Sequence, residues 1–261
     1  MKKVTAEILK NEMLNTAMCR MVLAVGKDEN GEACRLRPGQ FVNIRIDGLF
    51  LRRPISVCDF TEDGRLTIVF KKVGKGTEKL AAMTPGEKLD LLAELGNGYD
   101  LSKAGPRPVL LGGGAGVPPM YCLARMLAGT GVCRAEDITV ILGFNTASEL
   151  YMEDDFRALG AKVIITTADG SRGTRGFVTD ALAALTSESG GEPYTYTYAC
   201  GPEPMLRAVY SKSAASGQYS FEERMGCGFG ACMGCSCKTV TGCKRICKDG
   251  PVLEKEEILW D

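Results

Sequence analysis

The most constraining feature of this chain is a group of cysteines toward its C-terminal end. Six of the twelve cysteines fall between Cys227 and Cys247, and three of these have the spacing Cys227-x4-Cys232-x2-Cys235. Together with a later fourth cysteine, this is the spacing that holds a plant-type [2Fe–2S] cluster. The segment is too short to bury an apolar core of its own, so something else must hold it together.

Four thiolates could also hold a structural zinc ion. Zinc sites usually combine two short C-x2-C pairs, whereas this segment has only one, Cys232-x2-Cys235. The residues between the cysteines are mostly glycine and alanine, which lets backbone amides approach the sulfides of a cluster. The spacing therefore favours [2Fe–2S], with zinc or unliganded thiols as the alternatives.

The position of the fourth ligand depends on how the chain returns after Cys235. A β-hairpin that turns at Thr241-Gly242 would pair Ser236 with Cys247 and bring Cys247 back beside Cys235. Cys243 would stay near the turn, roughly 10 Å or more away at about 3.3 Å per residue. Proximity therefore favours Cys247 over Cys243.

The chain has 12 Cys and no His, which limits its chemistry. Without an imidazole there is no Ser–His or Cys–His catalytic pair, no His-ligated zinc and no Rieske cluster. A reducing compartment keeps thiols free of disulfides, so this many cysteines indicates metal binding or redox chemistry. Lys and Arg together number 32, as do Asp and Glu, and this balance argues against bulk binding to nucleic acid or anionic membranes.

No segment suggests a secretory or membrane signal. Charged residues stand where an apolar signal core would lie. The most apolar stretch, residues 109–127, is broken by glycines, prolines and an arginine. We therefore expect a cytoplasmic protein that does not enter the membrane.

The first part of the chain, residues 1–102, has the pattern of an antiparallel β-barrel. Short alternating or apolar runs recur at regular spacing and are separated by Gly, Pro and Asp turns. One helix interrupts them near Thr77–Met83. The expected strands are Val4–Leu9, Met18–Val25, Phe41–Ile46, Leu66–Phe70 and Lys88–Leu92.

Residues 103–215 instead alternate apolar strands with helices, which predicts a doubly wound parallel sheet of the nucleotide-binding kind. Residues 216–261 complete the chain as a small cysteine-rich domain. The expected strands of the sheet are Pro108–Leu111, Ile138–Leu142, Val163–Thr167 and Tyr194–Ala199, and the expected helices are Met120–Ala128, Asp154–Leu159 and Pro204–Ala215.

Two motifs in the predicted barrel suit a cofactor that carries a diphosphate. In Arg53-Pro54-Ile55-Ser56, a strand-borne arginine can pair bidentately with a diphosphate while the serine reaches a ring nitrogen. Gly74-Lys75-Gly76-Thr77 opens the predicted helix, where free amides make a phosphate site. Either motif by itself could be plain structure, but the pair within one β domain favours a site.

A third motif, Gly112-Gly113-Gly114-Ala115-Gly116, lies between a predicted strand and a predicted helix. Glycines there let a pyrophosphate approach the backbone at the helix N-terminus. Cys200-Gly201-Pro202 ends the last strand of the same sheet, where the thiol could contact a nicotinamide ring. The alternatives are a purely structural turn and, for Cys200, a small buried apolar side chain.

Taken together, these motifs resemble the ferredoxin–NADP reductase superfamily. The C-terminal run Glu223–Cys235, followed by Cys247–Val252, resembles the electron-transfer subunits of dihydroorotate dehydrogenase B. This resemblance covers essentially the whole chain. It implies a flavin-binding barrel, an NAD-binding domain and an iron–sulfur domain that together move electrons.

The resemblance also implies particular sites and partners. Ser56 and Cys200 would lie at the reacting rings, and NAD(H) would be the substrate dinucleotide. The partner would be an FMN-containing catalytic subunit that oxidises dihydroorotate in pyrimidine synthesis, in a heterotetramer of two plus two. The implied FAD residues are Arg53, Pro54, Ile55, Ser56, Val69, Phe70, Lys71, Gly76 and Thr77, and the implied cluster ligands are Cys227, Cys232, Cys235 and Cys247.

Some residues depart from the family pattern. Cys237 and Cys243 are not expected, which leaves alternative ligation open, and Ile55 replaces an aromatic residue. The stretch after the second strand of the sheet lacks a basic residue for a 2′-phosphate, which favours NAD over NADP, although Arg172 and Arg175 could reach one.

Two other classes of function fit part of the pattern. One is a related subunit of an NADPH:ferredoxin oxidoreductase, a sulfide dehydrogenase or an anaerobic sulfite reductase. The other is a redox-sensing binding module that uses its spare thiols as a switch.

Overall fold

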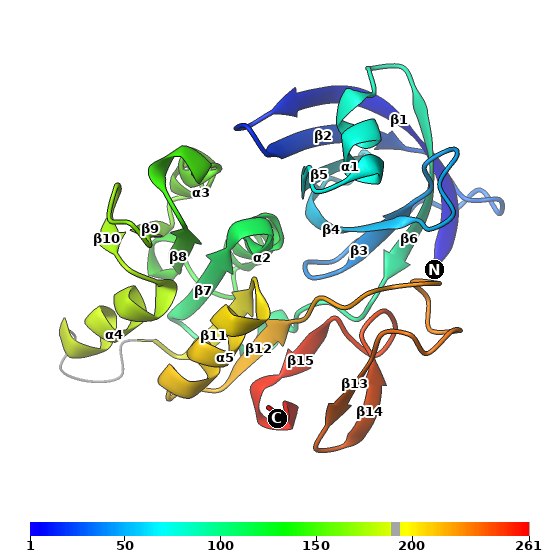
Figure 1. Cartoon of the computed structure of the whole chain (residues 1–261). Coiled ribbons are helices and arrows are strands. Elements are labelled where there is room, and N and C mark those ends of the chain that lie inside the picture. The colour runs from blue at the N-terminus through cyan, green and yellow to red at the C-terminus, as the bar shows by residue number, and fades with distance from the viewer. Residues whose placement is uncertain (189–193, 261) are drawn as a thin grey trace.

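A computed structural model describes residues 1–188 and 194–260. Its N-terminal part is a closed antiparallel barrel with the strand order β1-β2-β5-β4-β3-β6 (Figure 1). The predicted barrel and its helix are confirmed, with small shifts at the ends of the elements, but β4 is not among the five strands that the sequence predicted. The strands are β1 (Lys2–Met13), β2 (Met18–Val25), β3 (Phe41–Ile44), β4 (Arg53–Phe60), β5 (Arg65–Lys71) and β6 (Lys88–Leu95), and the helix is α1 (Lys75–Ala82).

Alternation of side chains builds the barrel core. Along β1, Val4, Ala6 and Ile8 are buried while the residues between them are exposed. Helix α1 is tied to this strand by Asn11, whose Nδ2 donates to the carbonyl of Met83 at 2.7 Å. The core thus holds the strands and the helix that carry the predicted flavin motifs.

The second part of the chain is a seven-stranded sheet with the order β10-β9-β8-β7-β11-β12-β15. Every neighbouring pair is parallel except β12 and β15. The strands are β7 (Pro108–Gly113), β8 (Thr139–Phe144), β9 (Lys162–Thr167), β10 (Thr174–Arg175), β11 (Tyr196–Cys200), β12 (Gly217–Ser220) and β15 (Val252–Glu254), and the helices are α2 (Val117–Gly129), α3 (Glu153–Ala158), α4 (Val178–Glu188) and α5 (Glu203–Lys212).

Helices cover both faces of this sheet, as predicted. Leu110 of β7 belongs to one core with α2 and α3, whereas its neighbour Leu111 belongs to a second core with α4 and α5. Successive strand residues point to opposite faces, so the strands are apolar throughout. Helix α4 and the short strands β10, β12 and β15 are not among the predicted elements. The three strands are two to four residues long and lack a longer apolar run of their own.

The barrel packs against the sheet domain through α2. Arg125 of α2 forms an ion pair with Asp59 of β4 at 2.6 Å and donates to the carbonyl of Phe60 at 2.7 Å. Arg20 of β2 forms an ion pair with Asp155 of α3 at 2.8 Å. No helix of the described residues is long and apolar enough to cross a bilayer.

The C-terminal segment contains the hairpin β13 (Ser236–Thr239) and β14 (Gly242–Arg245). The predicted register is wrong by two residues, because Ser236 pairs with Arg245 rather than with Cys247. The turn lies one residue earlier than expected: Thr239 pairs with Gly242, and its hydroxyl donates to the Gly242 carbonyl at 2.8 Å. After the hairpin, β15 returns to the edge of the large sheet (Figure 1).

Candidate functional site

The two predicted flavin motifs lie against each other. Arg53 begins β4, and Gly76 lies in the first turn of α1. A Cβ atom on Gly76 would be 2.3 Å from Nε of Arg53, so glycine is what lets the guanidinium lie on the helix. Arg53 donates to the carbonyls of Leu51 (2.6 Å) and Arg52, and pairs with no carboxylate among the described residues. A guanidinium without an acidic partner, beside a helix N-terminus, suits a diphosphate.

The remaining flavin-motif residues lie around this contact. The Oγ1 atom of Thr77 accepts from the N–H of Val73 at 2.9 Å and donates to the carbonyl of Gly74 at 3.1 Å, which closes the start of α1. Strands β4 and β5 are neighbours in the barrel, so their motif residues are contiguous. Pro54, Ile55 and Ser56 are half-buried on β4, whereas on β5 Val69 and Phe70 are buried and Lys71 is exposed.

The glycine-rich turn joins β7 to α2 and abuts the end of β11. A Cβ atom on Gly116 would be 2.1 Å from the carbonyl oxygen of Cys200, and one on Gly113 would be 2.4 Å from Sδ of Met205. Gly114, at φ +51°, has open space around it. Close packing thus explains two of the glycines, and Gly114 leaves room for a ligand at the backbone.

Cys200 lies at the carboxyl end of β11, beside Gly112 of β7. Burial raises the pKa of its thiol to about 12, despite a hydrogen bond with Ser220. Gly201 and Pro202 follow and lead into α5. A neutral thiol in this place can contact an uncharged ring but is not a base at neutral pH.

The predicted flavin and nucleotide sites adjoin. Strand β5 contacts the 3₁₀ turn Gly114–Gly116, and β4 packs on α2. Val69 of β5 belongs to the same core as Val117 of α2. Two motifs that lie about forty residues apart in sequence are therefore brought together at the boundary between barrel and sheet.

The four predicted cluster ligands form two pairs. The N–H of Cys232 donates to Sγ of Cys227 at 3.4 Å, and the N–H of Cys227 donates to Sγ of Cys232 at 3.5 Å. The N–H of Cys247 donates to Sγ of Cys235 at 3.4 Å. Across residues 1–188 and 194–260, no three His, Cys, Asp or Glu side chains converge on a single metal position. Two pairs of thiols match the ligation of a two-iron cluster, in which two cysteines bind each iron.

Backbone amides favour a thiolate at Cys227. The N–H of Ala231 donates to its Sγ at 3.2 Å. Partial burial opposes ionisation, but the amides of residues 229, 231 and 232 outweigh it and lower the pKa of Cys227 to about 6. At Cys247, burial and a neighbouring thiol raise the pKa to about 12. The backbone amides thus favour the ionised form of the Cys227 thiol over that of the Cys247 thiol.

The two further cysteines lie on opposite faces of the hairpin. Cys237 pairs with Lys244, and Cys243 pairs with Lys238. Adjacent pairs of a ladder point to opposite faces. Cys243 is exposed, while Cys237 is half-buried. They cannot both face the predicted ligands.

Asn43 is a residue that the sequence analysis missed. It lies on β3, is 1% exposed, and its Nδ2 donates to the carbonyl of Cys227 at 3.3 Å. The available signal was a single polar residue within the apolar run Phe41–Ile44. Through Asn43 the flavin-motif barrel forms a hydrogen bond with the cysteine loop.

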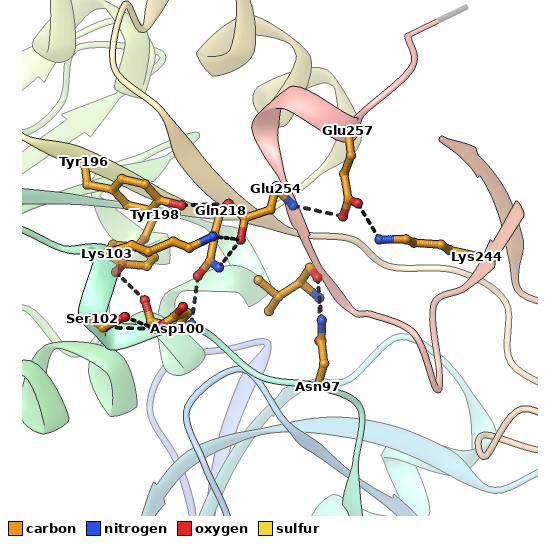
Figure 2. A network of polar contacts seen from close by, with 11 residues as sticks. Asn97, Asp100, Ser102, Lys103, Tyr196, Tyr198, Gln218, Lys244, Glu254 and Glu257 are labelled. Carbon is orange, nitrogen blue, oxygen red and sulfur yellow. Dashed lines mark hydrogen bonds and ion pairs between the residues drawn. The ribbon is translucent and has the colours of Figure 1, made fainter. Parts of the chain in front are cut away.

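A polar network joins the C-terminal segment to the other two parts of the chain (Figure 2). The carboxylate of Glu254 on β15 accepts from Lys103 (2.6 Å), Gln218 (2.7 Å) and Tyr196 (2.9 Å). Burial opposes ionisation of Glu254, but these hydrogen bonds outweigh it, so its pKa lies below the ordinary value. The network anchors the end of the cysteine segment to the sheet.

The network continues on both sides of Glu254. Its backbone N–H donates to Glu257, which also forms an ion pair with Lys244 of the hairpin. Asn97, where the chain leaves the barrel, donates to the carbonyl of Val252 at 2.7 Å. Figure 2 shows these groups between the barrel exit, the sheet edge and the hairpin.

Solved structures share this architecture. The NADH-dependent reduced ferredoxin-NADP oxidoreductase, studied for flavin-based electron bifurcation, matches with a TM-score of 0.85 and 30% identity over 98% of this chain and 90% of that chain. A ferredoxin NADP+ reductase from Neisseria gonorrhoeae, with bound FAD and NADP, matches with a TM-score of 0.63 and 18% identity over 81% and 90%. The fold and the similarity to the first of these structures therefore define an oxidoreductase of the ferredoxin reductase class.

The C-terminal segment narrows this class. Residues 222–259 match the iron-sulfur cluster binding domain of dihydroorotate dehydrogenase B, and residues 110–211 match an oxidoreductase NAD-binding domain. The dihydroorotate dehydrogenase B (NAD(+)) electron transfer subunit of Bacillus caldolyticus is 42% identical over 233 residues, covering 85% of this chain and 87% of that protein. The subunit of Fusobacterium nucleatum is 44% identical over 227 residues, covering 84% and 85%.

The chain belongs to the family of dihydroorotate dehydrogenase B electron transfer subunits. The predicted fold class, the NAD-binding domain and the iron–sulfur domain are thereby confirmed. The boundaries at residues 102 and 215 and the individual site residues stay predictions.

Proposed function

We propose that this chain moves electrons between NAD(H), an FAD, a [2Fe–2S] cluster and the FMN of a partner catalytic subunit. The observation that carries the proposal is the adjacency of three candidate sites. Strand β5 contacts the glycine turn Gly114–Gly116, and Asn43 of the barrel donates to the carbonyl of Cys227. A flavin exchanges electron pairs with a nicotinamide and single electrons with a cluster, and the protein supplies their positions.

Each candidate site has a defined task in this proposal. Arg53 and the N-terminus of α1, with Gly76 and Thr77, hold the FAD diphosphate, and Ser56 bonds the flavin ring. The turn Gly112–Gly116 holds the NAD pyrophosphate, and the neutral Cys200 thiol lies beside the nicotinamide. The cluster ligands are Cys227, Cys232, Cys235 and Cys247, in the two pairs that the hydrogen bonds define.

The contacts around Arg172 support NAD as the dinucleotide. Arg172 forms an ion pair with Glu153 at 2.9 Å, and Glu153 also binds Arg157. A carboxylate in this place competes with a 2′-phosphate for the guanidinium. We expect a lower apparent KM for NADH than for NADPH.

The names of the relatives support a catalytic partner, since they are electron transfer subunits of dihydroorotate dehydrogenase B. The partner would carry FMN, oxidise dihydroorotate to orotate, and assemble with this chain as a cytoplasmic heterotetramer of two plus two. This chain supplies no His and needs no acid or base for orotate chemistry.

Reconstitution tests the proposal. The anaerobically purified chain should show flavin and cluster absorbance and NADH-dependent dye reduction, and should gain dihydroorotate oxidation only when the partner is added. Turnover of dihydroorotate by this chain in the absence of the partner, or a colourless protein that contains zinc, would refute it.

A second function is favoured by the 30% identity to the ferredoxin-NADP oxidoreductase over 98% of this chain. In that case the reduced chain would pass electrons to ferredoxin. Replacing the catalytic partner with ferredoxin in the same assay separates the two functions, because the first requires the partner.

A further inference from the structure

Asn43 connects two parts of the molecule that lie 184 positions apart in sequence. All four residues of β3, Phe41–Ile44, are buried, and Asn43 is the polar one. On one side it lies opposite Pro54, inside the Arg53–Ser56 motif of β4. On the other side its amide reaches the loop that begins at Cys227.

The contact with the loop is close and directional. Nδ2 of Asn43 donates to the carbonyl of Cys227 at 3.3 Å. Gly228 follows at φ +79°, and a Cβ atom there would be 2.3 Å from Nδ2 of Asn43. Reversing the amide would place two oxygens against each other, so only the donor can face the carbonyl.

The backbone under Asn43 is held in place. Nη1 of Arg52 donates to the Asn43 carbonyl at 3.2 Å and to the Asp90 carbonyl at 3.0 Å, and its Nη2 forms an ion pair with Asp90 at 2.7 Å. Arg52 precedes Arg53, which takes the proposed diphosphate. The amide therefore projects from a rigid part of the flavin barrel.

The other end of the amide has no evident structural use. Oδ1 of Asn43 is buried and has no hydrogen-bond partner among the described residues. A buried acceptor without a partner is unfavourable, and a leucine of similar volume would fill the space without that cost. The amide is thus better explained by its donation to Cys227 than by stability.

We propose that Asn43 is a positioning residue for electron transfer, which fixes the first cluster ligand, Cys227, relative to the flavin strands. This inference rests on the proposed function, with Cys227 as a ligand. Partners just outside the ligand shell orient the ligands and tune the metal group. Loss of the amide should therefore alter the cluster and its exchange with the flavin, while hydride transfer from NADH to the flavin is unaffected.

The test compares wild type, Asn43→Leu and Asn43→Asp as full-length chains purified anaerobically with flavin and cluster. Stopped-flow absorbance after mixing with NADH resolves flavin bleaching from the later cluster reduction. We expect Asn43→Leu to slow cluster reduction by about ten- to a hundredfold, the range in which loss of such a partner lowers metal affinity or activity. Flavin bleaching should keep its wild-type rate. The EPR g values of the reduced cluster should also shift.

The aspartate variant has the same shape and, at a pH above the burial-raised pKa of its carboxyl, places an anionic oxygen against the Cys227 carbonyl. Negative charge near the cluster disfavours an added electron, so the reduction potential of the cluster in Asn43→Asp should become more negative. Gly228→Ala should reproduce the leucine result by pushing the loop away from Asn43.

Asn97→Leu is the matched control, because Asn97 also joins the barrel to the C-terminal segment but donates to the carbonyls of Asp249 and Val252 instead of a ligand. It should lower the melting temperature and leave the EPR signal unchanged. Wild-type cluster kinetics and g values in Asn43→Leu would overturn the inference. If wild type itself lacks a cluster or is not bleached by NADH, the proposed function fails instead.

Discussion

The cysteines in the cores of the two folded parts differ sharply from Cys227 and Cys232 of the C-terminal loop. In the barrel and sheet, Cys58 and Cys122 are buried in apolar surroundings, and burial raises the pKa of both. In the loop, Cys232 is exposed, and amide hydrogen bonds lower the pKa of Cys227 to about 6. The same side chain is thus a packing group where apolar atoms surround it and a potential ligand where backbone N–H groups converge.

The difference extends to how each region is held together. The barrel and sheet each enclose an apolar core, whereas within residues 222–235 the buried residues are Gly228, Gly230 and Cys235. A loop with so little apolar burial depends on a bound group and on its contacts to the rest of the chain. Removing a thiol should therefore reduce the iron content when the thiol is a ligand in the loop, and reduce the stability of the fold when the thiol is buried in the barrel or sheet.

The largest effect is expected at the proposed ligands. Cys247→Ser and Cys227→Ser should lose most of the iron and the visible cluster spectrum, because each removes a thiolate from one of the two pairs. Cys243→Ser is the matched control and should keep its iron. Iron and sulfide analysis per chain measures this. If Cys247→Ser kept its iron and Cys243→Ser lost it, the fourth ligand would be Cys243 and not Cys247.

The proposed flavin site of the barrel can be tested at Arg53. Arg53→Ala should weaken FAD binding by about 1.5–3 kcal/mol, the usual contribution of a hydrogen bond to a charged group. Equilibrium dialysis with FAD measures this affinity. Arg45→Ala, on the loop that leads toward the same motif, should bind FAD like wild type. If Arg53→Ala binds FAD as tightly as Arg45→Ala, Arg53 does not contribute to FAD binding.

A buried thiol outside the loop provides the opposite test. Cys122→Ser should lower the free energy of unfolding by about 1–3 kcal/mol, because it buries a hydroxyl in place of a thiol. Its iron content should stay at the wild-type level. Urea unfolding and iron analysis of the same preparation check both statements. If Cys122→Ser lost iron and kept its stability, the distinction between ligand cysteines in the loop and packing cysteines in the core would be wrong.

The smallest effect is expected at the network that attaches the segment to the sheet. The pKa of Glu254 lies below its ordinary value of 4.5, so its ionised form stabilises the fold above that value, and the contribution disappears as the pH falls through the lowered pKa. Glu254→Gln should therefore cost about 1 kcal/mol near neutral pH, and less in acid. Unfolding midpoints measured at several pH values test this. If the loss of stability in Glu254→Gln became larger toward low pH, the ionised form of Glu254 would not be the stabilising one.

Much of the fold and of the candidate sites could be predicted from local patterns in the sequence. The barrel strands follow from short alternating runs, the doubly wound sheet from strands alternating with helices, and the cluster motif from spacing within a few residues. The hairpin register failed because it depends on where the turn closes, and Thr239 closes it onto Gly242 one residue earlier than expected.

The sequence by itself determined the fold class, the motif residues and the family pattern, because each depends on neighbours along the chain. Only the tertiary structure decided that Arg53 lies on Gly76, that β15 completes the edge of the large sheet, and that Asn43 reaches Cys227. Those contacts join residues far apart in sequence, and their geometry depends on how whole strands and helices pack together.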